Sequence, residues 1–176
     1  RMRFGLAVLK AVRAEVGPDF CVGIRLCGDE FHPDGLSHED MKQIAKYYDD
    51  TGMLDFIGVV GSGCDTHNTL ANVIPNMSYP PEPFLHLAAG IKEVVKAPVL
   101  HAQNIKDPNQ ATRILEGGYV DMVGMTRAHI ADPHLIAKIK MGQVDQIKQC
   151  VGANYCIDRQ YQGLDVLCIQ NAATSR

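Results

Sequence analysis

The sequence predicts an α/β protein in which helices cover a parallel sheet. Short apolar runs of strand length alternate with helical patterns, and four such runs recur at intervals of roughly 25 to 45 residues. The runs are apolar on both faces, as strands of a covered parallel sheet are. No segment completes the G-x-G-x-x-G turn of an open doubly wound sheet, so part of an eight-stranded barrel is the favoured architecture.

The elements are expected in strict alternation along the chain. The first helix, 3–16, ends at Gly17-Pro18, and Ser37 with Asp40 forms a weak capping box for the second. Asp107-Pro108 opens a later helix that Gly117-Gly118 closes. The expected strands are 20–27, 54–60, 98–102 and 119–125. The expected helices are 3–16, 37–50, 84–95, 108–116, one opened by Pro133 and a short one over 143–149.

One connection, 61–83, stands out because it is too long to be a plain connector. It is rich in glycine, asparagine and proline. Two interpretations stay open: the segment forms a wall of a substrate pocket, or it only covers the rim of the barrel.

Charge and hydropathy exclude several classes of protein. With 17 basic and 20 acidic residues the net charge is 17 − 20 = −3, so a basic surface for nucleic acid is excluded. No apolar run approaches the roughly 20 residues of a membrane span. The chain starts at Arg1 without an initiator methionine or a signal pattern, so we expect a cytoplasmic protein and a fragment of a longer chain.

Polar residues gather where the expected strands end, which in a barrel is one mouth. Arg25 lies inside an apolar strand, where a charge is costly unless it is paired. Each residue alone could be structural, Arg25 as a paired core arginine and the glycines as ordinary turns. Taken together they favour a site for an anionic ligand, with Arg127 beside Gly124 suited to a phosphate. The other candidates are Gly61-Ser62-Gly63, His101, Gln103 and Asn104.

The six cysteines form two groups. Cys21, Cys27 and Cys64 lie in or just after apolar stretches and are expected to be buried and inert. Cys150, Cys156 and Cys168 crowd the last part of the chain, without the two close pairs of a zinc ribbon. An iron–sulfur cluster and buried structural thiols are both compatible with this spacing.

The whole chain resembles the second half of the flavin barrel in the iron–sulfur branch of the old yellow enzyme family, which includes trimethylamine dehydrogenase, 2,4-dienoyl-CoA reductase and N-methylproline demethylase. The resemblance is carried by Val22-Gly-Ile-Arg-Leu26, Ala97-Pro-Val-Leu-His-Ala102, the stretch from Asp121 to Pro133 and the tail from Cys150 to Ala172. It implies the last four βα units of a TIM (β/α)8 barrel over 1–149, followed by a cysteine-rich loop over 150–176.

The resemblance also implies roles for single residues. Arg25 matches a strand arginine at the pyrimidine end of FMN, where a cation stabilises the reduced flavin. His101 is a further candidate for contact with flavin or substrate, or a hydrogen-bonded histidine at a strand end. The residues matched to the FMN phosphate loops are Gly124, Thr126, Arg127, Gln103 and Asn104. Asn104 departs from the family, which commonly has arginine there.

For the tail, the resemblance implies that Cys150, Cys156 and Cys168 are ligands of an iron–sulfur cluster. Ala153 stands where the second of the family's four cysteines falls. A three-iron cluster, a fourth ligand such as Asn154 or Asp158, and no cluster are the alternatives.

The implied activity is FMN-dependent oxidative N-demethylation of a methylated amine or amino acid, with electrons passed to the cluster. Reduction of an activated C=C bond is one alternative. A non-catalytic remnant or electron-transfer subunit is another. The expected partners are a small-molecule substrate, the rest of the barrel, a nucleotide-binding portion and a second copy of the chain, with no nucleic acid.

Overall fold

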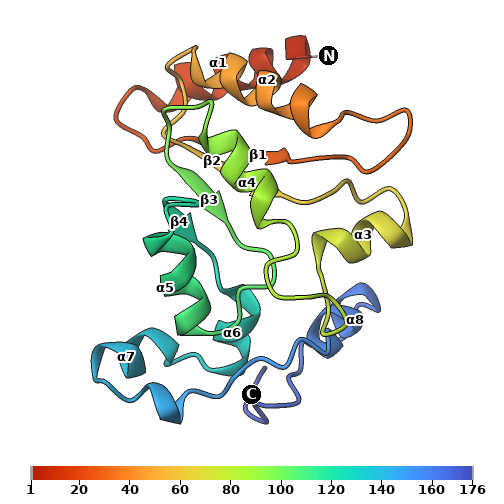
Figure 1. Cartoon of the computed structure of the whole chain (residues 1–176), viewed down its shortest axis with the longest axis vertical. Helices are drawn as coiled ribbons and strands as arrows, with labels where there is room; N and C mark the ends of the chain where they lie inside the picture. Colours follow the sequence, from red (N-terminus) through yellow and green to blue (C-terminus); the bar gives the residue numbers. More distant parts are fainter. Residues whose placement is uncertain (1, 176) are drawn as a thin grey trace.

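Four parallel strands form one sheet at the centre of the molecule (Figure 1). The coordinates are a computed structural model that describes residues 2–175. The strands are β1 (Gly23–Cys27), β2 (Phe56–Val60), β3 (Val99–His101) and β4 (Met122–Val123). They are neighbours in chain order, β1-β2-β3-β4. This order is that of consecutive βα units in a barrel, and it confirms the predicted fold class.

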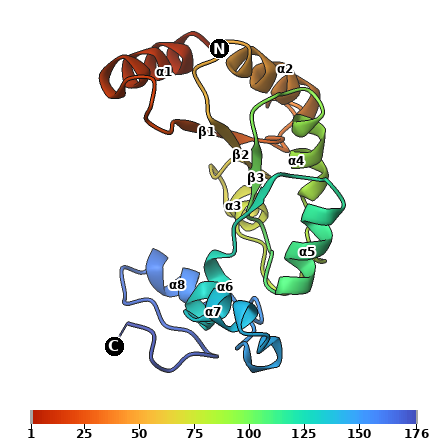
Figure 2. The same cartoon turned by 90° about the vertical axis from the view of Figure 1, so that its left-hand side faces the viewer.

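Helices cover one face of the sheet, which is its outer, convex face (Figure 2). They are α1 (Met2–Val16), α2 (His38–Asp49), α4 (Leu85–Lys92) and α5 (Pro108–Glu116). The predicted starts of two of them are confirmed: Ser37 and Asp40 form a complete capping box, and the Asp107 side chain accepts a hydrogen bond from the Gln110 amide.

The hydrophobic core lies between the sheet and these helices. Alternate strand residues point into it, including Ile57 and Val59 of β2 and Val99 of β3, all at most 2% exposed. Leu87 and Ile91 of α4 meet them from the helix side. The other face of the sheet is therefore left to form a site.

Three helices lie where the sequence predicted loops or strand ends: α3 (His67–Val73), α6 (Thr126–Ala131) and α8 (Tyr155–Tyr161). Each has six or seven residues, too short to show an apolar period. Strand β4 is shorter than the expected 119–125, and residues 20–22 precede β1. The helix opened by Pro133 is α7 (Leu135–Lys140), and 143–149 contains the 3₁₀ turn η1 (Val144–Gln146).

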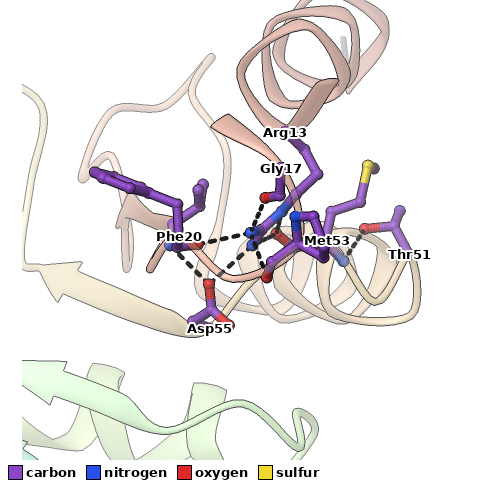
Figure 3. A network of polar contacts seen from close by, with 8 residues as sticks. Arg13, Gly17, Phe20, Thr51, Met53 and Asp55 are labelled. Carbon is purple, nitrogen blue, oxygen red and sulfur yellow. Dashed lines mark hydrogen bonds and ion pairs between the residues drawn. The ribbon is translucent and has the colours of Figure 1, made fainter. Parts of the chain in front are cut away.

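Arg13 joins α1 to the loops at the amino-terminal ends of β1 and β2 (Figure 3). Its guanidinium donates to the carbonyls of Phe20, at 2.7 Å, and Met53, at 2.6 Å, and pairs with Asp55 at 2.8 Å. Asp55 also accepts from the Val22 amide, and these contacts lower the pKa of its carboxyl. The Arg13 guanidinium thus links α1 to the segments that precede β1 and β2.

The expectation that the first three cysteines are buried is wrong for two of them. Cys21 and Cys64 are exposed, because one precedes β1 and the other follows β2 in a loop. Cys27 is half-buried, and burial raises the pKa of its thiol to about 11, so it stays protonated at neutral pH. Of the helices described, none is long and apolar enough to cross a membrane.

Candidate functional site: a cavity on the concave face of the sheet

A cavity of about 430 Å³ lies on the face of the sheet opposite the covering helices. Its floor comes from β1, β2 and β3, and its walls come from the ends of α3, α6 and α8. Figure 2 shows α3 and α8 on the inner side of the curve, away from α4 and α5. The residues lining the cavity are Gly23, Ile24, Arg25, Phe56, Gly58, Val59, Val60, Val73, Ile74, Leu100, Ala102, Gln103, Thr126, Arg127 and Ile157.

Arg25 extends from β1 along the floor of this cavity. It pairs in register with Gly58 of β2, which pairs with Leu100 of β3, so the three form one row across the sheet. The Arg25 side chain is exposed and makes no hydrogen bond or ion pair within residues 2–175. The alternative of a paired core arginine therefore does not hold. Its guanidinium donors are free for a ligand.

Arg127 reaches the same cavity from α6, which follows β4 at the opposite edge of the sheet. One terminal nitrogen, Nη1, donates to the Pro75 carbonyl at 2.8 Å and to the Asn154 side-chain oxygen. Nε and Nη2 have no partner within the part of the chain that the structure describes, which leaves a fork for an anion. Burial lowers the pKa of the guanidinium, but an arginine stays charged at any physiological pH.

Gln103 and Thr126 also line the cavity, as the sequence predicted for ligand-contacting residues. The Gln103 amide nitrogen donates to the carbonyls of Asn72, at 2.7 Å, and Val73, at 3.1 Å, at the end of α3. Its oxygen is buried and has no partner among the described residues. A buried acceptor without a donor is costly, and this oxygen lies beside Gly61, where an added Cβ would approach it to 2.8 Å.

Two predicted phosphate contacts, Gly124 and Asn104, do not line the cavity. A Cβ on Gly124 would lie 2.8 Å from the Ala102 Cβ, so glycine permits close packing there. Asn104 is buried in a left-handed conformation (φ 57°) and donates to the Pro80 carbonyl. The backbone carbonyl of Asn104 accepts from Gln110, so this asparagine holds the long loop against α5.

His101 points to the opposite face of β3, into the helix-covered core. It is fully buried, and its Nδ1 lies 3.3 Å from the Val59 carbonyl. Burial lowers the pKa of the ring to about 4, so the ring is neutral at pH 7. Side chains alternate along a strand, and this places Leu100 and Ala102, but not His101, at the cavity. Of the two roles that the sequence left open, the placement matches the hydrogen-bonded histidine at a strand end.

The three carboxy-terminal cysteines line a second, small cavity behind Arg127. Cys150, Cys156, Cys168 and Ala153 all border it. Within residues 2–175, no group of three or more cysteine, histidine, aspartate or glutamate side chains is placed so that it could hold a metal ion. Burial and the neighbouring Cys150 raise the pKa of Cys156, while Arg127 opposes this rise.

The two other candidate ligands in this tail are engaged elsewhere. The Asn154 side chain accepts from Arg127 and donates to the Ile74 carbonyl at 2.8 Å. An Asp158 oxygen accepts from Gln162 at 2.8 Å on the exposed side of α8. Neither supplies the position that Ala153 leaves without a thiol.

The walls of the cavity include candidate site residues that sequence reasoning missed. Val73 and Ile74 of the long segment 61–83 and Ile157 of α8 line the cavity. Of the two roles considered for that segment, this position matches the wall of a pocket. The one available signal was Thr66, whose side chain caps α3 with Thr69.

A curved parallel sheet with helices on its outer face and a cavity on its inner face is the architecture of consecutive units of an α/β barrel. The family model described as the NADH:flavin oxidoreductase / NADH oxidase family matches residues 1–146. The chain belongs to this family.

Relatives and solved structures agree with that assignment. The N,N-dimethylglycine/sarcosine dehydrogenase of Chromohalobacter salexigens is 86% identical over the whole chain, which covers 25% of that protein. The "Probable N-methylproline demethylase" of Rhizobium meliloti is 43% identical over the whole chain, which covers 26% of it. A 2-naphthoyl-CoA reductase structure matches 98% of the chain, and 26% of its own length, at 27% identity and a TM-score of 0.88. The chain spans about a quarter of the length of these curated relatives.

Proposed function

We propose that the chain forms the second half of the flavin-binding barrel of an FMN-dependent oxidoreductase that demethylates an N-methylated amino acid. The observation that carries this proposal is the placement of two arginines with free donors, Arg25 and Arg127, at one apolar cavity. The dimethylglycine/sarcosine dehydrogenase, 86% identical to this chain, points to the substrate class.

The residues of the cavity fit FMN, a flat ring system with a phosphate tail. Gly58 leaves space in the middle of the row that Arg25, Gly58 and Leu100 form, and Arg25 at one end of this row would supply a cation for the ring. The free Nε and Nη2 of Arg127, with Thr126, suit the phosphate. When bound, FMN supplies the hydride acceptor, and the protein supplies orientation and charge.

For the second cofactor, we infer that Cys150, Cys156 and Cys168 are the thiolates that would bind an iron–sulfur cluster. All three border one small cavity, and cysteine thiolates are the usual ligands of iron–sulfur clusters. Ala153 leaves one corner of a four-iron cluster without a thiol. Iron and acid-labile sulfide analysis tests this inference, and protein without sulfide after anaerobic reconstitution would contradict it.

The visible spectrum and two substrate assays test the proposed activity. We expect flavin absorption bands, and formaldehyde release from dimethylglycine, sarcosine or N-methylproline. Reduction of a dienoyl-CoA without demethylation would favour the second candidate, C=C reduction, which the likeness to the naphthoyl-CoA reductase supports. A protein that stays colourless after incubation with FMN would contradict both and favour a non-catalytic remnant.

A further inference from the structure

Arg127 forms part of the wall between the flavin cavity and the cysteine cavity, and it borders both of them. Asn154 borders the cysteine cavity from the other side of the guanidinium. Between these two side chains lies the hydrogen bond from Arg127 Nη1 to Asn154 Oδ1. The cysteine loop and the flavin cavity are therefore joined through this pair.

Asn154 is held firmly enough to orient the arginine. Its Nδ2 donates to the Ile74 carbonyl at 2.8 Å, and Ile74 itself lines the flavin cavity. Arg127 Nη1 donates in addition to the Pro75 carbonyl at 2.8 Å, the next residue along the chain. Both hydrogens of Nη1 are thus used, and Nε and Nη2 have no partner among the described residues, in a side chain that lines the cavity.

The backbone of Asn154 has a left-handed conformation, and its side chain bonds Arg127 and Ile74. Its φ is 57°, in the left-handed region, at the residue that precedes α8. Asparagine tolerates this region better than most residues. Its side chain makes no capping hydrogen bond to the helix, which leaves both amide atoms for Arg127 and Ile74.

We propose that Asn154 is a positioning residue, which couples the cysteine loop to the phosphate end of the flavin cavity by holding the guanidinium of Arg127. This inference rests on the proposed function, since it takes FMN as the ligand. It adds that the loop from Cys150 to Cys156 contributes to flavin affinity without touching the flavin. A flavin that lacks the phosphate would not sense this contribution.

The test compares FMN with riboflavin, which has the same ring and no phosphate. Flavin-free protein is titrated with each, and binding is followed by quenching of flavin fluorescence. Asn154→Gly removes the amide and keeps the backbone unstrained, because glycine accepts a positive φ. We expect the Kd for FMN to rise about tenfold, as for the loss of one hydrogen bond to a charged group, while the Kd for riboflavin stays within about twofold.

Two further variants separate positioning from damage to the fold. Asn154→Asp keeps an oxygen for Arg127, and we expect it to bind FMN within about threefold of the unchanged protein. Gln162→Ala changes the exposed residue that directly follows α8, and we expect it to change neither Kd. An equal loss of FMN and riboflavin affinity in Asn154→Gly, or no loss at all, would overturn the inference. Failure of the unchanged protein to bind either flavin would instead overturn the proposed function.

Discussion

Arg25 and Arg127 line the same cavity although they come from opposite edges of the sheet, one from β1 and the other from α6 after β4. Parallel strands bring their carboxyl ends to one side, and the curvature of the sheet turns the two edges toward each other (Figure 2). The cations therefore lie at one site, where each has donors that no described residue uses.

Arg25→Met tests the charge at the ring end of the cavity. Removal of a cation disfavours the negative charge of reduced flavin, so we expect the flavin reduction potential to fall by about 30 mV or more, which is about 1.4 kcal/mol for two electrons. Arg25→Lys keeps the charge but loses the planar guanidinium, so we expect its reduction potential to fall less than that of Arg25→Met. Redox titration measures both, with the exposed Arg3→Met as control. An unchanged potential in Arg25→Met would contradict the assignment.

Gly61 and Gly63 form a matched pair at the carboxyl end of β2. A Cβ on Gly61 would lie 2.5 Å from the Phe84 ring, whereas one on Gly63 would find its nearest atom at 3.4 Å. Gly61→Ala forces the core to shift, and we expect it to lower the free energy of unfolding by about 1–3 kcal/mol. Gly63→Ala should change it by less than about 0.5 kcal/mol. Denaturant unfolding measures both values, and equal losses would show that the packing around Gly61 is not tight.

His101 gives a pH dependence of stability with a defined sign. Its pKa is about 4 in the folded protein, against the ordinary value of 6.5. Between these two pH values His101 is protonated in the unfolded chain and neutral in the folded protein. The stability that the neutral, buried ring contributes is therefore complete above pH 6.5 and is lost as the pH falls to about 4. His101→Gln should remove this part of the pH dependence, at most about 1.4 kcal/mol per pH unit.

The measurement for His101 is the free energy of unfolding of both proteins from pH 7 to pH 4. The exposed His67→Gln serves as a control, and we expect it to keep the full dependence. The His101 side chain faces away from the cavity, so we also expect His101→Gln to bind FMN normally. A large loss of FMN affinity with unchanged stability would restore His101 to the site.

Substitutions of Arg13 test how much its contacts at the amino-terminal ends of β1 and β2 stabilise the protein. Arg13→Ala leaves the carbonyls of Phe20 and Met53 and the carboxylate of Asp55 without their donor. We expect a loss of about 2 kcal/mol in the free energy of unfolding. Arg13→Lys cannot reach all three acceptors with one nitrogen and should recover less than half of that loss. Thermal or denaturant unfolding decides, and full recovery by lysine would mean that charge alone matters.

The sequence was sufficient for features that local chemistry determines. Alternating apolar runs predicted the parallel sheet, and Ser37 and Asp107 marked helix starts that the structure confirms. Arg25 stands out because a charged residue inside an apolar strand needs a partner, and the alternation of side chains along β1 places it on the concave face.

Sequence reasoning failed where tertiary contacts decide. His101 is buried because the helices cover its face of β3, and the residues of β3 alone do not show which face that is. The partners of Asn154 lie in distant segments, and the short helices α3 and α8 are too brief to show a period. Cys21 and Cys64 were expected to be buried because they lie in or just after apolar stretches, but both fall outside the strands and are exposed.

The central claim is that Arg25 and Arg127 act on one FMN molecule, and paired titrations test it most directly. Flavin-free Arg25→Met, Arg127→Met and the double variant are titrated with FMN and with riboflavin. We expect Arg25→Met to weaken both flavins and Arg127→Met to weaken FMN alone, each by about tenfold or more. Tight binding of FMN by the double variant would contradict the account.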